Sequence, residues 1–308
     1  MSHEVSDADT VDSEQQALSK IFTVVPRPGA SSPEKAPEHF IGGVAPATFD
    51  RIYGGLLAGQ SILAAAHTVG SGRRPNSLHI SFLRSGEPDE RVEYGVERIR
   101  DSRSLSTRLV RAHQGGQLLS LATVSFHIAD VGLSHQASSF GVGPLPSPEE
   151  VPSRREQLLA DHGTDLPLNA GTDVPVDIRY IDRIPWAVTE PQEPKNRAWL
   201  RLPFSIDDSF SAHAAAVAFM TDFPMFEPAL FPHGIPWAAV VSGEALFGSS
   251  LDHSVWFHQD ARADNWLLLV QESSITTHSR GMCRAEVFDA AGALVASVAQ
   301  EIVFVRPR

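Results

Sequence analysis

A glutamine interrupts the apolar face of an otherwise regular strand pattern near the end of the chain. The segment "LVASVAQEIVFVR" (294–306) alternates, and alternate side chains of a strand share one face. Gln300 stands on the apolar face, where an amide without partners would cost about 1–3 kcal/mol. It therefore either ties down a neighbouring strand or contacts water or a ligand. The apolar members of this face are Leu294, Ala296, Val298, Ile302 and Phe304.

Asp222 is the second residue with a chemical use. It is the only carboxylate in the helical segment "SAHAAAVAFMTDF" (211–223), and Pro224 should end the helix close to it. A carboxylate at a helix C-terminus meets the negative end of the helix dipole. That position raises its pKa and, with partial burial, makes it a better proton acceptor. The alternative is an exposed aspartate that only terminates the helix.

Ser250 opens an expected strand over 250–259, "SLDHSVWFHQ". A serine at a strand start is usually a turn residue, and the chain has no GxSxG elbow for a nucleophilic serine. Asp252 and His253 follow, but neighbours in a strand point to opposite faces, so we expect a structural role for that pair. The single cysteine, Cys283, is expected to be a buried, inert thiol.

Three further groups of residues have simple structural explanations. The segment "YGGLLAGQ" (53–60) lacks the P-loop and dinucleotide patterns and favours close packing of a helix on a sheet. The 13 histidines show no HExxH or other ligand spacing, so no metal site is expected. Five arginines form either a solvated strand face or an anchor for phosphates: Arg98, Arg100, Arg103, Arg108 and Arg111.

Antiparallel strands and two apolar helices must position these residues. Each helix, over 54–70 or 211–223, has little polar face and is expected to be buried. Strand-like segments separated by turn signals follow each helix. They cover 75–84, 91–100, 104–113 and 117–129 in the first half, and 250–259, 265–277, 279–288 and 292–306 in the second.

The second half repeats the plan of the first. The alignment pairs Ser77 with Ser250 and Leu118 with Leu294, and it places Gln300 opposite Val124. The fold therefore tolerates an apolar residue at the position of Gln300, which favours a functional role. A helix followed by four strands is the pattern of a sheet wrapped around a helix, and two such sheets could join edge to edge.

The chain divides into an acidic tail (1–18), a first module (19–130), a linker rich in Pro, Gly and Ser (131–175) and a second module (176–308). One short helix is expected in the linker around 153–162. The formal charge of −12, from 25 Lys+Arg against 37 Asp+Glu, disfavours binding to nucleic acids or anionic membranes. No apolar run reaches the roughly 18 residues of a membrane span, so no stable membrane insertion is expected. One cysteine fits a cytoplasmic location.

Four segments, in this order and spacing, resemble the acyl-CoA thioesterase II family. They are "GGLLAGQSILAAAHTV", "SLHISFLRSGEP", "SLDHSVWFHQDARADNWLLL" and "GALVASVAQEIV". The resemblance covers the chain from about residue 40 to the end, outside the linker. It implies an α+β fold, the double hotdog, in which two tandem modules each wrap an antiparallel sheet around a long central helix.

The family's catalytic set consists of an aspartate on the second helix, a threonine or serine before the "LDHS" strand and a glutamine in the last strand. These positions match Asp222, Ser250 and Gln300. Serine supplies the same donor and acceptors as threonine. The resemblance implies hydrolysis of fatty acyl-CoA to a free fatty acid and CoA, without a cofactor or a covalent intermediate. Asp222 would be the general base, and Ser250 and Gln300 would orient the water.

The substrate and the assembly state give further expectations. The acyl chain needs an apolar tunnel, whose candidate lining residues could equally be ordinary core. A homo-oligomer is expected from the sheet-pairing habit of the hotdog. One alternative is a non-catalytic protein that binds acyl-CoA. Another is a hotdog hydratase or dehydratase, whose pairing of aspartate with a histidine at the helix start we do not find. The candidate substrate-binding residues are Gly54, Gly55, Arg103, Met220, Phe223, Phe226 and Trp256.

Overall fold

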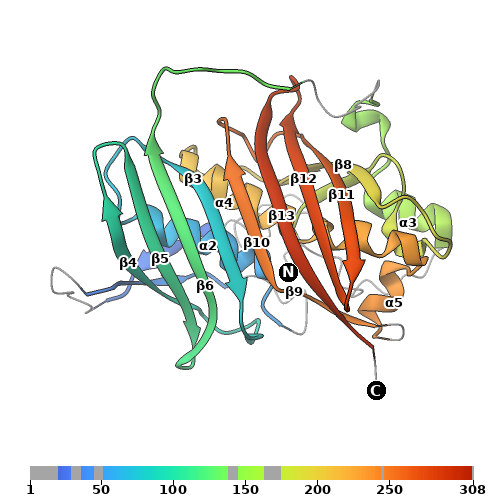
Figure 1. Cartoon of the computed structure of the whole chain (residues 1–308), viewed down its shortest axis with the longest axis horizontal. Helices are drawn as coiled ribbons and strands as arrows, with labels where there is room; N and C mark the ends of the chain where they lie inside the picture. Colours follow the sequence, from blue (N-terminus) through green and yellow to red (C-terminus); the bar gives the residue numbers. More distant parts are fainter. Residues whose placement is uncertain are drawn as a thin grey trace, which may run out of the picture.

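The fold is dominated by one large antiparallel sheet, seen in a computed structural model (Figure 1). The structure describes residues 20–28, 36–44, 51–137, 145–162, 175–243 and 246–306. The expected tail (1–18) and parts of the expected linker (131–175) lie outside these residues. The 13 strands run in the order β1-β2-β4-β5-β6-β3-β10-β13-β12-β11-β8-β7, and β9 pairs with β13 outside this path.

The strands of the first half are β1 (Val24–Pro26), β2 (Glu38–Gly42), β3 (Arg73–Phe82), β4 (Glu93–Asp101), β5 (Leu105–Gln114) and β6 (Gln117–Ile128). Those of the second half are β7 (Asp177–Tyr180), β8 (Lys195–Arg201), β9 (Phe247–Ser250), β10 (Asp252–Phe257), β11 (Leu267–Thr277), β12 (Arg280–Asp289) and β13 (Leu294–Val305). Short hairpins link β4 to β5, β5 to β6, β11 to β12 and β12 to β13. Gly115 and Gly116 form the β5–β6 turn with φ of 54° and 81°, the left-handed conformation that a two-residue hairpin turn requires.

The helices are α2 (Gly54–Ala66), α3 (Arg154–His162), α4 (Phe210–Asp222) and α5 (Trp237–Val241). Short 3₁₀ helices occupy η1 (Lys20–Phe22), η2 (Pro148–Glu150), η3 (Pro185–Ala187), η4 (Pro224–Ala229) and η5 (Phe231–His233). The structure confirms the two apolar helices and the short helix expected in the linker. In the described part of the chain, no helix has the length and apolarity needed to cross a membrane.

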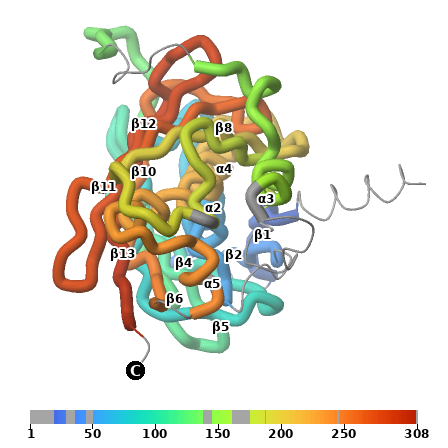
Figure 2. Tube along the Cα trace, turned by 90° about the vertical axis from the view of Figure 1, so that its right-hand side faces the viewer, coloured from blue at the N-terminus to red at the C-terminus, as the bar shows by residue number. Residues whose placement is uncertain are grey.

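The helices α2 and α4 lie together against one face of the sheet, behind the strands in Figure 1. The helix α2 contacts β3 to β6, and α4 contacts β3 and β10. A methyl group on Gly59 of α2 would lie 2.8 Å from the carbonyl oxygen of Ala215 in α4. The glycines of 53–60 therefore serve close packing of helix on helix, rather than the expected packing of helix on sheet. Figure 2 shows α3 on the opposite side of the molecule from β11 and β13.

The two halves of the sheet meet where β3 pairs with β10, with His253 opposite Ile80 and Val255 opposite Leu78. The expected single strand over 250–259 is wrong, because the chain changes partners at Leu251. Ser250 ends β9 and pairs only with β13, whereas β10 begins at Asp252 and lies between β3 and β13. Leu251 itself donates its N–H to the Glu301 carbonyl at 2.8 Å.

Ser77, which the sequence alignment pairs with Ser250, has different surroundings. Ser77 lies inside β3, where it faces Trp256 of β10 and Ser125 of β6. Val124 of β6 lies opposite Leu78 of β3, so the expected apolar counterpart of Gln300 is part of an apolar cross-strand pair.

Three of the five arginines between residues 98 and 111 pair with carboxylates. Arg98 pairs with Glu38 at 2.8 Å, and Arg111 pairs with Glu97. Arg108 is fully buried, contacts Asp101 at 2.9 Å and donates to the Thr68 hydroxyl at 2.7 Å, just beyond the end of α2. These three arginines therefore serve the sheet and the end of a helix, and neither of the two explanations drawn from the sequence describes Arg108.

Candidate active site

The side chain of Gln300 connects the three residues that the sequence singled out. Its Nε2 donates to Ser250 Oγ at 2.7 Å and lies 3.3 Å from the backbone carbonyl oxygen of Asp222. Gln300 is fully buried and Asp222 is 5% exposed. Three separate elements, β13, β9 and the end of α4, thus converge on one buried amide. The alternation of β13 places Gln300 on the buried face, as expected.

Local structure explains why Asp222 and Ser250 reach this point. The helix α4 ends at Asp222, and η4 begins at Pro224, because a proline has no N–H with which to continue the hydrogen bonds of the helix. On the other side, Ser250 pairs with Ile302, two residues along β13 from Gln300. The end of β9 and the middle of β13 therefore present their side chains to the end of α4.

The carboxylate of Asp222 has an unusual environment. Its Oδ1 is buried and has no hydrogen-bond partner among the residues that the structure describes. Burial raises the pKa of Asp222 to about 7, and a hydrogen bond from the backbone N–H of Gly55 opposes that rise. We expected the dipole of α4 to raise this pKa. Burial is the main cause instead, because ionising a carboxyl group away from water is costly. A carboxyl group with this pKa can take up a proton near neutral pH.

The N-terminal turn of α2 packs directly against Asp222. A methyl group on Gly54 would lie 2.9 Å from Oδ2 of Asp222, and one on Gly55 would lie 2.5 Å from the Phe219 carbonyl oxygen. Both glycines therefore allow the first turn of α2 to approach the last turn of α4. The first half of the chain thus contributes to the surroundings of a carboxylate that belongs to the second half.

Tyr53, the residue before α2, inserts its hydroxyl into the last turn of α4. It donates to the Phe219 carbonyl at 2.6 Å and accepts from the Phe223 N–H at 2.9 Å. In a regular helix these two backbone groups, four residues apart, would bond to each other. The hydroxyl bridges them and so sets the backbone on both sides of Asp222. No sequence pattern indicated this role, which depends on a contact between residues 166 positions apart.

His253 is the residue that sequence reasoning missed. It is fully buried, and its Nδ1 lies 2.6 Å from Gln300 Oε1. Its Nε2 lies 3.2 Å from the hydroxyl of Thr221, the neighbour of Asp222. The signal was available, because His253 shares the buried face of β10 with Val255 and interrupts it as Gln300 interrupts β13.

Apolar and aromatic candidates for substrate contact lie next to Asp222. Met220 and Phe223 are buried at the end of α4. The rings of Phe223 and Phe226 both meet Trp237 of α5 edge to face, with centroids 5.5 and 5.2 Å apart. Phe223 and Phe226 therefore both contact α5, and Met220 is buried two residues before Asp222 in α4.

The structure does not bring the other two candidates to the site. Trp256 is 39% exposed and lies on the face of β10 opposite to His253, where its ring meets His79. Arg103 is exposed in the β4–β5 turn, and its carbonyl accepts from Arg73, beyond the C-terminal end of α2. The helix α2 has 13 residues and is about 20 Å long. Asp222 lies near its N-terminal end, whereas Arg103 lies beyond its C-terminal end.

Arg51 lies on the site's side of α2. Its guanidinium donates to the Gly248 carbonyl of β9 at 3.1 Å and covers the Phe247 ring at 4.5 Å from the centroid. Arg51 therefore contacts the strand β9, which ends at the catalytic candidate Ser250. The contacts described above for the arginines of the 98–111 cluster do not reach this strand.

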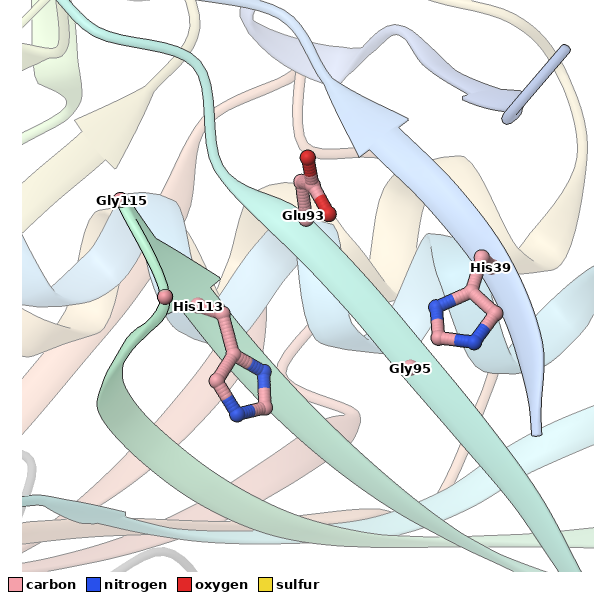
Figure 3. Close-up of a pocket in the computed structure, with 6 residues that line it drawn as sticks. His39, Glu93, Gly95, His113 and Gly115 are labelled. Atoms are coloured by element: carbon pink, nitrogen blue, oxygen red, sulfur yellow. The ribbon is translucent and has the colours of Figure 1, made fainter.

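A separate pocket opens on the outer face of the sheet (Figure 3). His39 and His113 flank the part of β4 that carries Glu93 and Gly95. Tyr94, between them, points the other way and donates to Gln60 of α2. The pocket therefore faces away from both helices and from Asp222.

Comparisons with known proteins agree with these features. Residues 44–127 match the acyl-CoA thioesterase N-terminal domain, and residues 148–304 match the acyl-CoA thioesterase C-terminal domain. Human acyl-coenzyme A thioesterase 8 is 34% identical over 270 residues, which cover 84% of this chain and 82% of that relative.

Solved structures agree with the fold. An acyl-CoA thioesterase II from Mycobacterium marinum is 29% identical with a TM-score of 0.71, covering 94% of this chain and 98% of its own. A protein with a hotdog fold from Alicyclobacillus acidocaldarius is 19% identical with a TM-score of 0.67, covering 95% and 99%. With the large antiparallel sheet, these likenesses show that the fold is a hotdog.

Proposed function

Since the chain belongs to the acyl-CoA thioesterase II family and is an acyl-CoA hydrolase, we propose that Asp222, Ser250 and Gln300 form its catalytic site. The observation that carries this proposal is the Gln300 amide, which joins the Ser250 hydroxyl to the backbone of Asp222 in a buried place. The substrate is a fatty acyl-CoA, and the products are a free fatty acid and CoA.

The proposed reaction is a direct attack of water on the thioester carbonyl. Asp222 takes one proton of the water as the new C–O bond forms, and the C–S bond then breaks to release the thiolate of CoA, which receives that proton. The pKa of about 7 suits this role, because a general base works best when its pKa lies near the working pH. Ser250, which accepts from Gln300, keeps its own proton to donate to the water oxygen.

The developing oxyanion needs hydrogen-bond donors in a place that excludes water. We assign this task to the N-terminal turn of α2, whose positive dipole end faces the site. In this turn the Gly55 N–H donates to Asp222 and the Leu56 N–H to the Tyr53 carbonyl, so we propose the Gly54 N–H as the donor. The close approach of Gly54 to Asp222 supports this choice. The Gln300 amide is less suited to this task, because its N–H groups are directed to Ser250 and to the Asp222 carbonyl.

The acyl chain is proposed to extend along Met220, Phe223 and Phe226, the apolar candidates that lie beside Asp222. For the phosphates of CoA we propose Arg51 in place of Arg103, because Arg51 contacts β9 and Arg103 lies beyond the far end of α2. Arg51→Ala should raise KM for acyl-CoA about tenfold, while Arg103→Ala should change it less than twofold. The opposite result would favour Arg103 as the residue that binds the phosphates of CoA.

The finer architecture is also a proposal. We propose a double hotdog in which residues 19–130 wrap around α2 and residues 176–308 wrap around α4, with 131–175 as the linker. The six strands on each side of the β3–β10 pairing, with β9 beside β13, support it. We further propose a homo-oligomer, which the exposed side chains of Leu121 and Trp256 on the sheet favour, and size-exclusion chromatography with light scattering tests it. The single free cysteine supports a cytoplasmic location.

Release of free thiol from a panel of acyl-CoA chain lengths tests the reaction. Asp222→Asn and Gln300→Ala should each lower kcat about 10²–10⁴-fold while the protein stays folded, because general-base catalysis contributes about that much. Cys283 should not disturb a thiol assay on the native protein, since burial raises its pKa to about 12. Binding without thiol release at every chain length would instead favour the non-catalytic alternative.

The hydratase or dehydratase alternative finds little support in the geometry. His213 lies in the first turn of α4, but Asp222 ends the same helix nine positions later, about 13 Å away. The histidine that does reach the site, His253, contacts Gln300 and belongs to a strand.

A further inference from the structure

The buried imidazole of His253 lies between the end of α4 and the catalytic glutamine. It comes from β10, and it contacts Gln300 Oε1 at 2.6 Å on one side and Thr221 Oγ1 at 3.2 Å on the other. Of these two partners, only Gln300 belongs to the proposed catalytic set. The question is what His253 does for that amide.

The surroundings of Gln300 determine which way its amide points. A backbone carbonyl can only accept a hydrogen bond, so the group that lies 3.3 Å from the Asp222 carbonyl must be the NH₂. The same NH₂ donates to Ser250 Oγ at 2.7 Å. The amide oxygen therefore faces His253.

This orientation fixes the tautomer of His253. Because Gln300 Oε1 only accepts, His253 must carry its proton on Nδ1 and donate it. Its Nε2 then carries no proton and lies 3.2 Å from the Thr221 hydroxyl, whose own proton has a second acceptor in the Val217 carbonyl at 2.8 Å. A flipped amide would bring its oxygen against the Asp222 carbonyl and its NH₂ against the Nδ1 proton, so the histidine opposes the flip.

The first half of the sheet shows that the fold does not need this polar pair. At the position that the sequence aligns with Gln300, Val124 lies opposite Leu78 of β3. Both of those side chains are fully buried and apolar. The replacement of such a pair by histidine and glutamine beside Asp222 indicates a task at the site.

We infer that His253 is a positioning residue that holds the Gln300 amide with its NH₂ group toward Ser250 and Asp222. This inference rests on the proposed function. Through Gln300 it keeps the Ser250 oxygen occupied as an acceptor, so that the Ser250 proton points to the attacking water. His253 itself touches no reacting atom.

A double-mutant cycle tests this role, because a residue that acts only through Gln300 loses its effect when Gln300 is absent. His253→Leu should lower kcat about 10–100-fold with KM changed less than threefold. In a Gln300→Ala background the same substitution should change kcat less than twofold. The matched control is His79→Leu, on the outer face of β3, where His79 contacts Ser254; it should leave kcat within twofold.

A second pair of variants keeps the test decisive if His253→Leu does not fold. Asparagine can place an N–H near the position of Nδ1, whereas glutamine places it near Nε2. His253→Asn should therefore retain most of the kcat, and His253→Gln should lose it. Equal losses from His253→Leu in both backgrounds, or equal activity of the Asn and Gln variants, would overturn the inference. If Gln300→Ala itself leaves kcat unchanged, the proposed function fails instead.

Discussion

The α-carbon of Gly54 faces the Asp222 carboxylate so closely that an added methyl group would lie 2.9 Å from Oδ2. Such a contact forces the carboxylate or the helix to move, and small displacements of a catalytic group can cost about 10²-fold in rate. Gly54→Ala should therefore lower kcat at least tenfold. Steady-state thiol release at saturating acyl-CoA measures it.

The control for this variant is Gly70→Ala. Gly70 follows α2, and nothing lies within 4 Å of the position that its methyl group would take. Its substitution should leave kcat within twofold. If Gly54→Ala is as active as Gly70→Ala, the first turn of α2 does not constrain Asp222.

The Tyr53 hydroxyl should matter more for rate than for stability. Without it, the Phe219 carbonyl and the Phe223 N–H can bond directly, which would tighten the last turn of α4 and shift Asp222. Tyr53→Phe should lower kcat about tenfold. Its free energy of unfolding should fall by about 1 kcal/mol, the usual effect of one lost hydrogen bond.

Tyr94→Phe provides the comparison, because it removes another buried hydroxyl, which donates to Gln60 at 2.9 Å. It should destabilise the protein by a similar amount and leave kcat unchanged. Equal kcat in the two variants would contradict the positioning of Asp222 by Tyr53.

The rate of hydrolysis should depend on pH through Asp222. A general base must be deprotonated, and the pKa of Asp222 is about 7. The rate should therefore reach a plateau above pH 7 and fall about tenfold for each pH unit below it. The pH profile of kcat measures this dependence, and Asp222→Asn should remove it together with most of the activity. A profile that is flat between pH 5 and 8 would exclude Asp222 as the base.

Glu227 is a second buried carboxyl group, and it should affect stability rather than catalysis. Burial raises its pKa to about 8, and its oxygens accept from Tyr180 and Gln271. Because this pKa is higher in the folded state than in the unfolded state, the folded state binds the extra proton. Its contribution to stability is fully present below about pH 4 and is lost as the pH rises through 8.

Glu227→Gln should therefore become more stable relative to the wild type as the pH rises. The difference in the free energy of unfolding between pH 5.5 and 9 should be on the order of a few kcal/mol. Chemical denaturation at the two pH values measures it. The midpoint of the pH profile of kcat should stay near pH 7 in this variant. A displaced midpoint would mean that Glu227, and not Asp222, causes the loss of rate at low pH.

Much of the fold could be predicted from the sequence because local patterns carry it. The alternation around Gln300 gave the buried face of β13, and Pro224 gave the end of α4. The break at Leu251 could not be predicted in this way, since it depends on which strands lie on either side. Alternation also does not say which face of β10 meets the site, and Trp256 lies on the outer one.

The site was predicted in part for the same reason. The polar residues on apolar faces, Gln300 and His253, are visible in the sequence, although only Gln300 was assigned a task. The role of Tyr53 depends on the approach of α2 to α4, which no local pattern contains. The pKa of Asp222 was expected to rise, but its cause, burial, is a property of the whole fold.

The pairing of β3 with β10 makes the two halves of this chain unequal partners. The second half carries Asp222, Ser250 and Gln300, while the first half supplies the turn of Tyr53, Gly54 and Gly55 that surrounds the carboxylate. Neither half can therefore be exchanged for a copy of the other. If Asp222 is the catalytic base as proposed, substitutions in the half without it should still inactivate the enzyme, and the two halves should be held to different sequence constraints.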